Sequence, residues 1–372
     1  MKFSSIATLI GSLALASAEV TLREAARDFM FGSSTDYYDF ESLENEIIPN
    51  TYNTIVAENS CKLYGIQVEQ GVYDFTNCDA DYEKSVELGL KFRGHCLIWH
   101  SYQPDWFQNL KGDDLRNAIV DHITTVMNHY KGKIDIWDVV NEAVSDDATG
   151  EGITYRDSYL YKEVPDFIDL SFKTAREVDP SVKLFYNDYD TEGTEIHKGK
   201  TQSAYNLVKD LVERGVPIDG VGIQYHINTE NYPKYEDVLE LFNKYADLGL
   251  EVQITEMDIM CNNGGTEEEF ALQAKLYEDA LRACLNSKNC TGFLVWGVND
   301  THSWKSDGYP LLIDKEYKPK PAYNALIKVF NEHFEKADEV SAEEDALDEN
   351  SAEEVVDAEI ETVAEDSSED EN

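Results

Sequence analysis

Basic residues are scarce in this chain, which has 31 Lys and Arg against 74 Asp and Glu among 372 residues. The resulting net charge of −43 makes nucleic acid and anionic membranes poor partners. Less than half of that charge lies in residues 337–372, which contain seventeen acids and no base, so the rest of the chain is also acidic. A neutral polymer remains a permitted substrate.

Long apolar runs and metal-binding spacings are also missing. The apolar stretch at residues 6–15 is shorter than the roughly 20 residues that a membrane helix needs, and no later segment is long enough. The histidines and cysteines form neither a His-x-x-x-His nor a Cys-x-x-Cys pattern. We therefore predict no membrane segment, no metal site and no cofactor.

The first 18 residues have the pattern of a secretory signal peptide. Lys2 provides a positive start, residues 6–15 are apolar, and Ala16-Ser17-Ala18 forms a small-residue cleavage site. We therefore expect a secreted, extracellular protein. The sequons at Asn289 and Asn299 are candidate glycosylation sites in that compartment.

The six cysteines can form disulfide bonds in an oxidising compartment. Two pairs are candidates, of which the first closes the smaller loop: Cys284 with Cys290, and Cys61 with Cys78. Whether Cys96 pairs with Cys261 stays open, although Cys96 lies in an apolar run that is typical of a buried free thiol.

Residues 19–336 alternate short apolar runs with amphipathic stretches. Eight runs are predicted strands, at residues 29–31, 54–57, 91–99, 134–140, 183–186, 221–223, 252–255 and 292–296. The stretches between them show helical spacing, as in residues 115–130, with Asp113 and Asp114 as candidate caps, and in residues 270–285, after a Thr266–Glu269 capping box. Eight β-then-α units predict an α/β fold with a single (β/α)8 TIM barrel.

Residues 337–372 differ in composition from the barrel region. They contain no aromatic residue, few large apolar residues and one sign of charge, so they cannot bury enough surface to fold. We predict an acidic, disordered C-terminal tail. It is either an interaction or solubility tail or, as we favour, a solvated extension with no specific partner.

Polar or aromatic residues stand at the C-terminal end of nearly every predicted strand. Active sites of (β/α)8 barrels are built at that face, from the ends of different strands. Two of these residues, Glu142 and Glu256, each follow an apolar run. Two carboxyl groups at one barrel mouth are what the cleavage of a glycosidic bond requires.

Several segments resemble glycoside hydrolase family 10, the endo-β-1,4-xylanase family. The matching segments begin at residue 58 (ENS), 93 (RGHCLIWH), 137 (WDVVNE), 186 (YNDY), 224 (QYH), 254 (ITEMDI), 295 (VWGV), 310 (PLL) and 318 (KPKPAY). They follow one another in order, and the resemblance spans roughly residues 20–332. A lone Asn-Glu pair occurs in related barrel glycosidases, whereas the ordered set is specific.

The resemblance implies that Glu142 is the acid/base and Glu256 the nucleophile of a retaining double displacement. Chemistry assigns the same division, because one carboxyl must stay protonated to protonate the leaving oxygen while the other must be ionised to attack. In retaining enzymes the two carboxyls lie about 5–5.5 Å apart. The resemblance also implies that Asn141 binds the 2-hydroxyl of the sugar.

The resemblance assigns further residues to the sugar and to the support of the nucleophile. His226 and Asp258 would orient Glu256, and Gln224 would belong to the same cluster. The remaining substrate-binding residues would be Glu58, Asn59, Lys62, His95, Trp99, Tyr189, Trp296 and Trp304. The two tryptophans would form a wall around the ring being cleaved, since the C–H face of a sugar stacks on aromatic rings.

The chain departs from the family pattern at a few positions. Leu63 stands in place of the Trp of Met-Lys-Trp, and Gln67 in place of the Glu of Glu-Pro. Tyr102 stands where Gln is common, and Lys305 where Arg is common. These changes lie on the non-reducing side of the cleft and bear on subsite affinity and preferred chain length.

We therefore expect a secreted, monomeric endo-β-1,4-xylanase that hydrolyses internal bonds of xylan, or xylo-oligosaccharides, with retention. One alternative is a retaining barrel glycosidase that acts on another β-glycan. A tight wall of Trp296 and Trp304 argues against it, since xylose lacks the exocyclic hydroxymethyl group of glucose. The other alternative is a non-catalytic carbohydrate-binding protein, which the presence of both Glu142 and Glu256 disfavours.

Overall fold

The computed structural model describes residues 20–36, 40 and 44–339. The predicted signal peptide, residues 1–18, lies outside the described residues. Of the predicted tail only residues 337–339 are described, and they continue a helix that begins at residue 321. Within the described part, none of the helices combines the length and the apolar character needed to cross a membrane.

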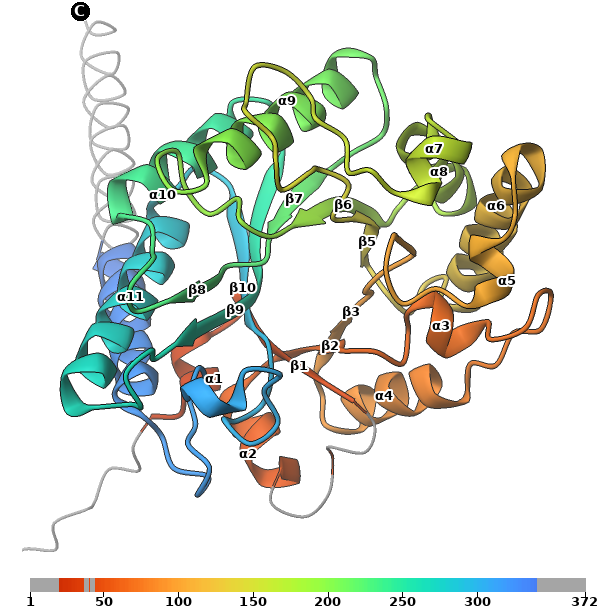
Figure 1. The fold of residues 1–372 in the computed structure, drawn as a ribbon. Coiled ribbons are helices and arrows are strands. Elements are labelled where there is room, and N and C mark those ends of the chain that lie inside the picture. Colours follow the sequence, from red (N-terminus) through yellow and green to blue (C-terminus); the bar gives the residue numbers. More distant parts are fainter. Residues whose placement is uncertain (1–19, 37–39, 41–43, 340–372) are drawn as a thin grey trace, which may run out of the picture.

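The centre of the fold is a barrel of parallel strands (Figure 1). The strands are β1 (Met30–Thr35), β2 (Thr54–Ala57), β3 (Lys91–Arg93), β4 (Ile98–Trp99), β5 (Ile136–Asn141), β6 (Lys183–Asp188), β7 (Gly220–Ile223), β8 (His226–Asn228), β9 (Glu251–Met260) and β10 (Cys290–Val295). Nine of them pair in the order β3-β2-β1-β10-β9-β7-β6-β5-β4.

The ring closes through a single run of chain that contributes two strands. Within it, β3 pairs with β2, β4 pairs with β5, and between them Gly94 bridges Trp137 of β5. The run of residues 91–99 therefore acts as one barrel strand, as the sequence predicts. Since β8 follows β7 after a short break, the ten segments make eight barrel strands, and the predicted (β/α)8 barrel is confirmed.

Helices surround the strands on the outside (Figure 1). They are α1 (Leu22–Ala26), α2 (Glu44–Thr51), α3 (Leu63–Ile66), α4 (Thr76–Glu87), α5 (Asp105–Gln108), α6 (Gly112–His129), α7 (Tyr159–Glu163), α8 (Phe167–Val178), α9 (Lys198–Glu213), α10 (Tyr235–Ala246) and α11 (Glu267–Asn286), followed by a 3-10 turn at Ser306–Gly308 and the helix at 321–339.

The helices cover the barrel because each turns one apolar stripe inward. In α8 the buried stripe includes Phe167, Ile168 and Phe172, and burial of such a side chain contributes about 1.5–3 kcal/mol. The predicted capping box of α11 is present, with Thr266 and Glu269 bonded reciprocally. These packed helices fix the strand ends that carry the site.

Two local predictions were incomplete or wrong. Asp113 and Asp114 do not cap α6, because the helix begins earlier: Lys111 is its N-cap, and both acids lie in the first turn. The predicted seventh strand ends at residue 255, whereas β9 continues to Met260 because its second half pairs with β8. That pairing aligns His226 with Asp258.

The structure pairs the cysteines that the sequence selects. Disulfide bonds join Cys61 to Cys78 and Cys284 to Cys290. Cys96 and Cys261, whose pairing the sequence left open, are both free and buried. The first disulfide ties the chain after β2, which leads into the site, to helix α4.

The two sequons differ in accessibility. Asn299 is fully buried, and its side-chain oxygen accepts bonds from the backbone N–H groups of Thr301 and His302. A glycan could not be attached to this buried side chain in the folded protein, so Asn299 is removed from the candidate glycosylation sites. Asn289 is only half-buried and its amide donates to the Leu250 carbonyl at 2.7 Å; its glycosylation stays a prediction.

Candidate active site

A cleft of about 480 Å³ opens at the C-terminal ends of the barrel strands. The fourteen residues that the sequence analysis assigns to catalysis, to substrate binding or to support of the nucleophile all line it: Glu58, Asn59, Lys62, His95, Trp99, Asn141, Glu142, Tyr189, Gln224, His226, Glu256, Asp258, Trp296 and Trp304. The fold brings all of them together, and the role of each stays a prediction.

Glu142 follows the last residue of β5 in an unusual backbone conformation. Its φ of 57° lies in the left-handed region, which costs a non-glycine residue on the order of 1 kcal/mol or more. Two hydrogen bonds hold it there: its N–H donates to the Asn187 carbonyl at 2.9 Å, and its own carbonyl accepts from Nε of Arg156 at 2.8 Å. Backbone strain that the surrounding structure maintains is concentrated at functional sites, where it fixes the direction of a side chain.

The carboxyl group of Glu142 is largely buried and accepts two hydrogen bonds. Nε1 of Trp99 donates to Oε2 at 2.7 Å, and Nε2 of Gln224 donates to Oε1 at 3.1 Å. Burial raises the pKa of Glu142 to about 7, the negative charge of Asp188 adds to this, and the two donors oppose it. Glu142 can therefore carry a proton near neutral pH, as a general acid must.

The carboxyl group of Glu256 lies on β9, facing the same cleft. Its Oε1 accepts from Nδ2 of Asn187 at 2.7 Å, and the same amide donates to Oδ1 of Asn141 at 2.9 Å. Asn187 fits there because residue 222 is a glycine: a Cβ at that position would lie 2.2 Å from the Asn187 side chain. Asn141 and Glu256 are thus fixed by one shared donor.

His226 holds Glu256 from the other side. Its Nδ1 lies 2.9 Å from Oδ2 of Asp258, and its Nε2 lies 3.3 Å from Oε2 of Glu256. Burial alone would lower the pKa of His226, but the charge of Asp258 and the two hydrogen bonds raise it to about 10. A protonated His226 donates from both nitrogens, one to each carboxylate.

The positive groups around Glu256 keep it ionised. Burial works to raise the pKa of Glu256, but the hydrogen bond from His226 and the charges of His95, His226 and Lys62 outweigh it and lower the pKa below its ordinary value. The two glutamates of one cleft are therefore shifted in opposite directions. Such a split is how paired carboxyls divide acid and nucleophile roles.

A polar layer beneath the cleft orients His95. The buried Arg93 forms an ion pair with Asp138, and Nδ1 of His95 lies 2.9 Å from Oδ2 of the same carboxylate. Burial would raise the pKa of Asp138, but Arg93 and His95 together lower it. Asp138 therefore remains ionised and accepts from Nδ1 of His95. Nε2 of His95, which lines the cleft, is not engaged by this carboxylate.

The chain after β2 supplies polar residues that line the cleft. The Asn59 backbone N–H and its side-chain amide both donate to Asp36, at 2.9 and 3.1 Å. Nζ of Lys62 donates to the Asn59 side-chain oxygen at 3.2 Å and lies 4.8 Å from the centre of a Trp99 ring. Tyr102 stacks on Trp99, with ring centres 5.5 Å apart and an interplanar angle of 8°.

Tyr189, at the start of the loop after β6, is held by charged groups. Its hydroxyl donates to Asp146 at 2.8 Å and accepts from Arg156 at 2.9 Å, and Nζ of Lys200 lies 3.2 Å from its ring centre. Burial works to raise the pKa of Asp146, but Arg156, Lys200 and Tyr189 lower it strongly. This network supports Tyr189 and, through the Arg156 bond to the Glu142 carbonyl, the acid/base candidate.

The two predicted wall tryptophans differ in exposure. Trp296 is 7% exposed and meets His95 edge to face, whereas Trp304 is 55% exposed. Nε1 of Trp304 donates to Asp258 at 2.7 Å, and Nζ of Lys305 lies 4.1 Å from a Trp304 ring centre. Trp304 therefore depends on the same carboxylate that orients His226.

The predicted set lacks several residues that contact the site, among them Asn187, Tyr102 and Arg156. Asn187 lies within the YNDY segment that carries the resemblance, so that segment offered the signal. Tyr102 was visible only as a departure from the family pattern. Arg156 carried no sequence signal, because its contacts with Glu142 and Tyr189 depend on the course of the loop after β5.

The comparison of the chain with protein families and known proteins agrees with this geometry. The model of glycosyl hydrolase family 10 matches residues 21–329. The chain is 47% identical over 332 residues to endo-1,4-beta-xylanase B of Neocallimastix patriciarum, which is 88% of this chain but 38% of that protein. The chain thus spans well under half the length of this relative.

Two further similarities cover more of the other protein. Endo-1,4-beta-xylanase A of Humicola insolens is 37% identical over 285 residues, 74% of each chain. The crystal structure of xylanase 10B from Thermotoga petrophila RKU-1 in complex with xylobiose superposes with a TM-score of 0.79 at 34% identity, covering 85% of this chain and 98% of that one.

Proposed function

Because the chain belongs to glycosyl hydrolase family 10, we propose that it is a secreted endo-β-1,4-xylanase that cleaves internal bonds of xylan with retention of configuration. The observation that carries the proposal is the opposite shift of two carboxyl groups in one cleft, Glu142 raised to a pKa of about 7 and Glu256 lowered. The xylanase names of the similar proteins and the xylobiose bound in one of them support the substrate class.

The first chemical step places each residue in one role. Ionised Glu256 attacks the anomeric carbon and forms a glycosyl ester, while the proton of Glu142 passes to the departing glycosidic oxygen. The side-chain oxygen of Asn141 accepts hydrogen bonds from Asn187 and Gln224. Its NH2 group is therefore left to donate to the 2-hydroxyl of the sugar. In the second step Glu142 removes a proton from water, which attacks the ester and releases Glu256.

The stereochemical outcome tests the double displacement directly. Two successive inversions return the configuration of the substrate, so the first product seen by NMR should be the β-anomer. An α-anomer as first product would rule out the nucleophile role of Glu256.

Glu256→Ala tests whether catalysis depends on this residue, and separates the enzyme from a carbohydrate-binding protein. We expect loss of hydrolysis by several orders of magnitude, with binding of xylo-oligosaccharides retained. If the variant hydrolyses xylan as the wild type does, both the mechanism and the site assignment fail.

Glu142→Gln tests the acid role separately. The variant should lose activity on xylan, but should still form the glycosyl ester from an aryl xyloside whose phenol leaves without a proton. A burst of phenol followed by slow turnover is the expected record, because the base of the second step is missing as well.

The choice of xylan over a glucose polymer rests on the walls of the cleft. We expect the buried Trp296 together with Trp304, whose indole N–H is bonded to Asp258, to exclude the hydroxymethyl group of glucose. The release of reducing ends from xylan and from carboxymethylcellulose should therefore differ strongly. Equal rates would favour the alternative enzyme, a barrel glycosidase for another β-glycan.

Secretion is supported by the sequence of residues 1–18 and by the two disulfide bonds. Expression of the full chain in a eukaryotic host should release protein into the medium. Its mass should correspond to a chain that starts at Glu19, and a protein that stays in the cell with residues 1–18 attached would contradict secretion.

A further inference from the structure

One carboxyl group outside the catalytic machinery has no partner. Glu192, in the loop between β6 and α9, is fully buried, and neither of its side-chain oxygens has a hydrogen bond within the described part of the chain. A charged carboxylate is rarely left in this state, because removal from water must be offset by a proton, a donor or a cation. Most buried polar groups in proteins are satisfied, so an exception points to a partner such as a bound ion.

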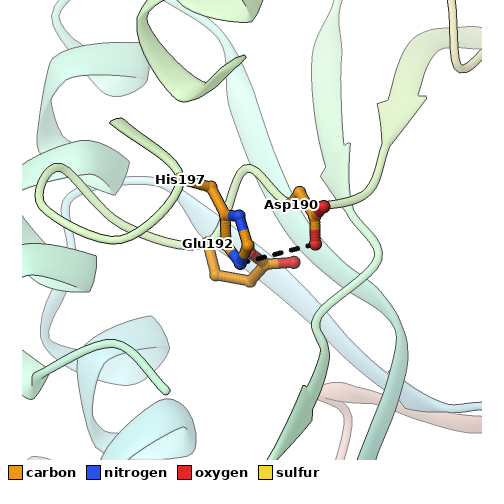
Figure 2. A group of neighbouring side chains, drawn as sticks. All are labelled: Asp190, Glu192 and His197. Carbon is orange, nitrogen blue, oxygen red and sulfur yellow. Dashed lines mark ion pairs between the residues drawn. The ribbon is translucent and has the colours of Figure 1, made fainter. Parts of the chain in front are cut away.

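Two potential metal ligands lie beside Glu192. Oxygens of Asp190 and Glu192 and a ring nitrogen of His197 all lie within 4.8 Å of one another. Figure 2 shows the two carboxylates and the imidazole ring gathered around one region of the loop. All three residues come from a stretch of eight, so the cluster belongs to a single loop.

The distances suit a small ion. Nε2 of His197 lies 3.6 Å from Oδ1 of Asp190, whereas two ligands of a tetrahedral zinc ion with bonds of about 2.0–2.1 Å lie about 3.4 Å apart. The His197–Asp190 pair is therefore near the zinc spacing, and the three ligand atoms, which lie within 4.8 Å of one another, would draw together on binding. The amide of Asn231 also lies 3.3 Å from Nε2 of His197, so metal binding would replace this contact.

The ligand types select among divalent ions. One imidazole nitrogen with two carboxylate oxygens is a set that suits zinc, while calcium and magnesium prefer oxygen ligands alone. The sequence itself predicts no metal site, because Asp-x-Glu followed by a histidine is neither a His-x-x-x-His nor a Cys-x-x-Cys pattern.

We propose that Asp190, Glu192 and His197 form a zinc site that ties the β6–α9 loop together beside the active-site cleft. Asp190 also lines that cleft, and Tyr189 precedes it in the chain. The ion would give the buried carboxylate its missing partner and restrain the loop on which Tyr189 is mounted. It would take no part in bond cleavage.

The full chain, treated with EDTA and desalted, is titrated with ZnCl2 by calorimetry and by thermal unfolding. We expect one ion per chain and, at about a hundredfold excess over Kd, a rise in Tm of about 4 °C. Calcium chloride should bind at least tenfold more weakly if the nitrogen ligand is used. No zinc binding by the chelated wild type overturns the proposal.

Variants identify the ligands. Glu192→Gln and His197→Gln should each abolish the one-to-one binding and the Tm rise. The side chain of His197 is partly exposed, so its variant should fold even if Glu192→Gln does not. Glu195→Gln is the matched control, because Glu195 lies in the same loop but is exposed and paired with Lys198; it should bind zinc as the wild type does. Binding that persists in both ligand variants overturns the assignment.

Discussion

Nε2 of His226 lies 3.3 Å from Oε2 of Glu256, and this contact links the charge of the candidate nucleophile to a second carboxylate. The other nitrogen of His226 is bonded to Asp258, which also accepts from Trp304. A partly buried histidine is held as a cation, and that cation lowers the pKa of Glu256. Charge state and geometry of the nucleophile are therefore set by the same contact.

Replacing His226 by Gln removes the charge and keeps a hydrogen-bond donor. A glutamate nucleophile must be ionised to attack, and loss of the neighbouring charge should raise the pKa of Glu256. The acid limb of the kcat/KM profile should therefore move to higher pH, by about 1–2 units. His129→Gln, on α6 and outside the cleft lining, is the control and should leave the profile in place. An unmoved acid limb in the His226 variant would contradict the coupling.

The alkaline side of the pH profile should report Glu142. Because its pKa is raised to about 7, activity should fall as pH rises through that value and the acid loses its proton. Trp99→Phe removes a donor that favours the ionised form, so the alkaline limb should move up by about one unit. KM should also rise, since Trp99 lines the cleft.

Trp106→Phe provides the comparison for that experiment. Its indole N–H donates to the Gln67 carbonyl, and Trp106 does not line the active-site cleft. An equal shift of the alkaline limb in both variants would show that Glu142 is not the group observed.

Tyr102 should contribute to the binding of longer substrates. It lines the cleft, is 64% exposed and stacks on Trp99, so its exposed ring surface offers a further platform for a sugar ring. Tyr102→Gln should raise KM for long xylo-oligosaccharides by roughly fivefold, as loss of about 1 kcal/mol of stacking predicts, and should change KM for xylobiose-sized substrates little. Tyr102→Phe should retain wild-type values, and a Gln variant with unchanged KM at every chain length would exclude the platform.

The disulfide between Cys61 and Cys78 should matter for stability and for the cleft. Its sequence separation of 17 corresponds to a stabilisation of about 3 kcal/mol through the unfolded state. The double variant Cys61→Ser/Cys78→Ser should lower Tm by several degrees and raise KM, because Lys62 and Asn59 lie beside Cys61.

Cys284→Ser/Cys290→Ser is the control for this experiment. It should lower Tm and leave KM unchanged, since neither cysteine lines the cleft. Equal KM values for the two double variants would argue against an ordering role.

Removal of the acidic tail should leave catalysis intact. A chain that ends at Glu339 keeps the ion pair between Arg27 and Asp338 and every residue of the cleft, so kcat/KM on xylan should stay within about twofold of the full chain. Loss of activity on truncation would give the tail a role that its composition does not predict.

The sequence by itself determined the barrel and selected the two candidate catalytic carboxyl groups. Apolar runs of strand length and amphipathic stretches report burial directly, so eight strands, both disulfide bonds and the positions of Glu142 and Glu256 could be read from local patterns. The ordered segments of the family then supplied the cleft residues. Each strand, helix and motif among these signals lies within a short stretch of sequence.

Only the tertiary structure decided how those residues act on one another. The pairing of β8 with β9 brings His226 to Asp258, the glycine at 222 makes room for Asn187, and the turn of one loop gathers Asp190, Glu192 and His197. It also buried Asn299 and left Cys96 and Cys261 apart. Such contacts depend on strand register and loop conformation. Both are set jointly by residues that are distant in the chain, so no local sequence pattern predicts them.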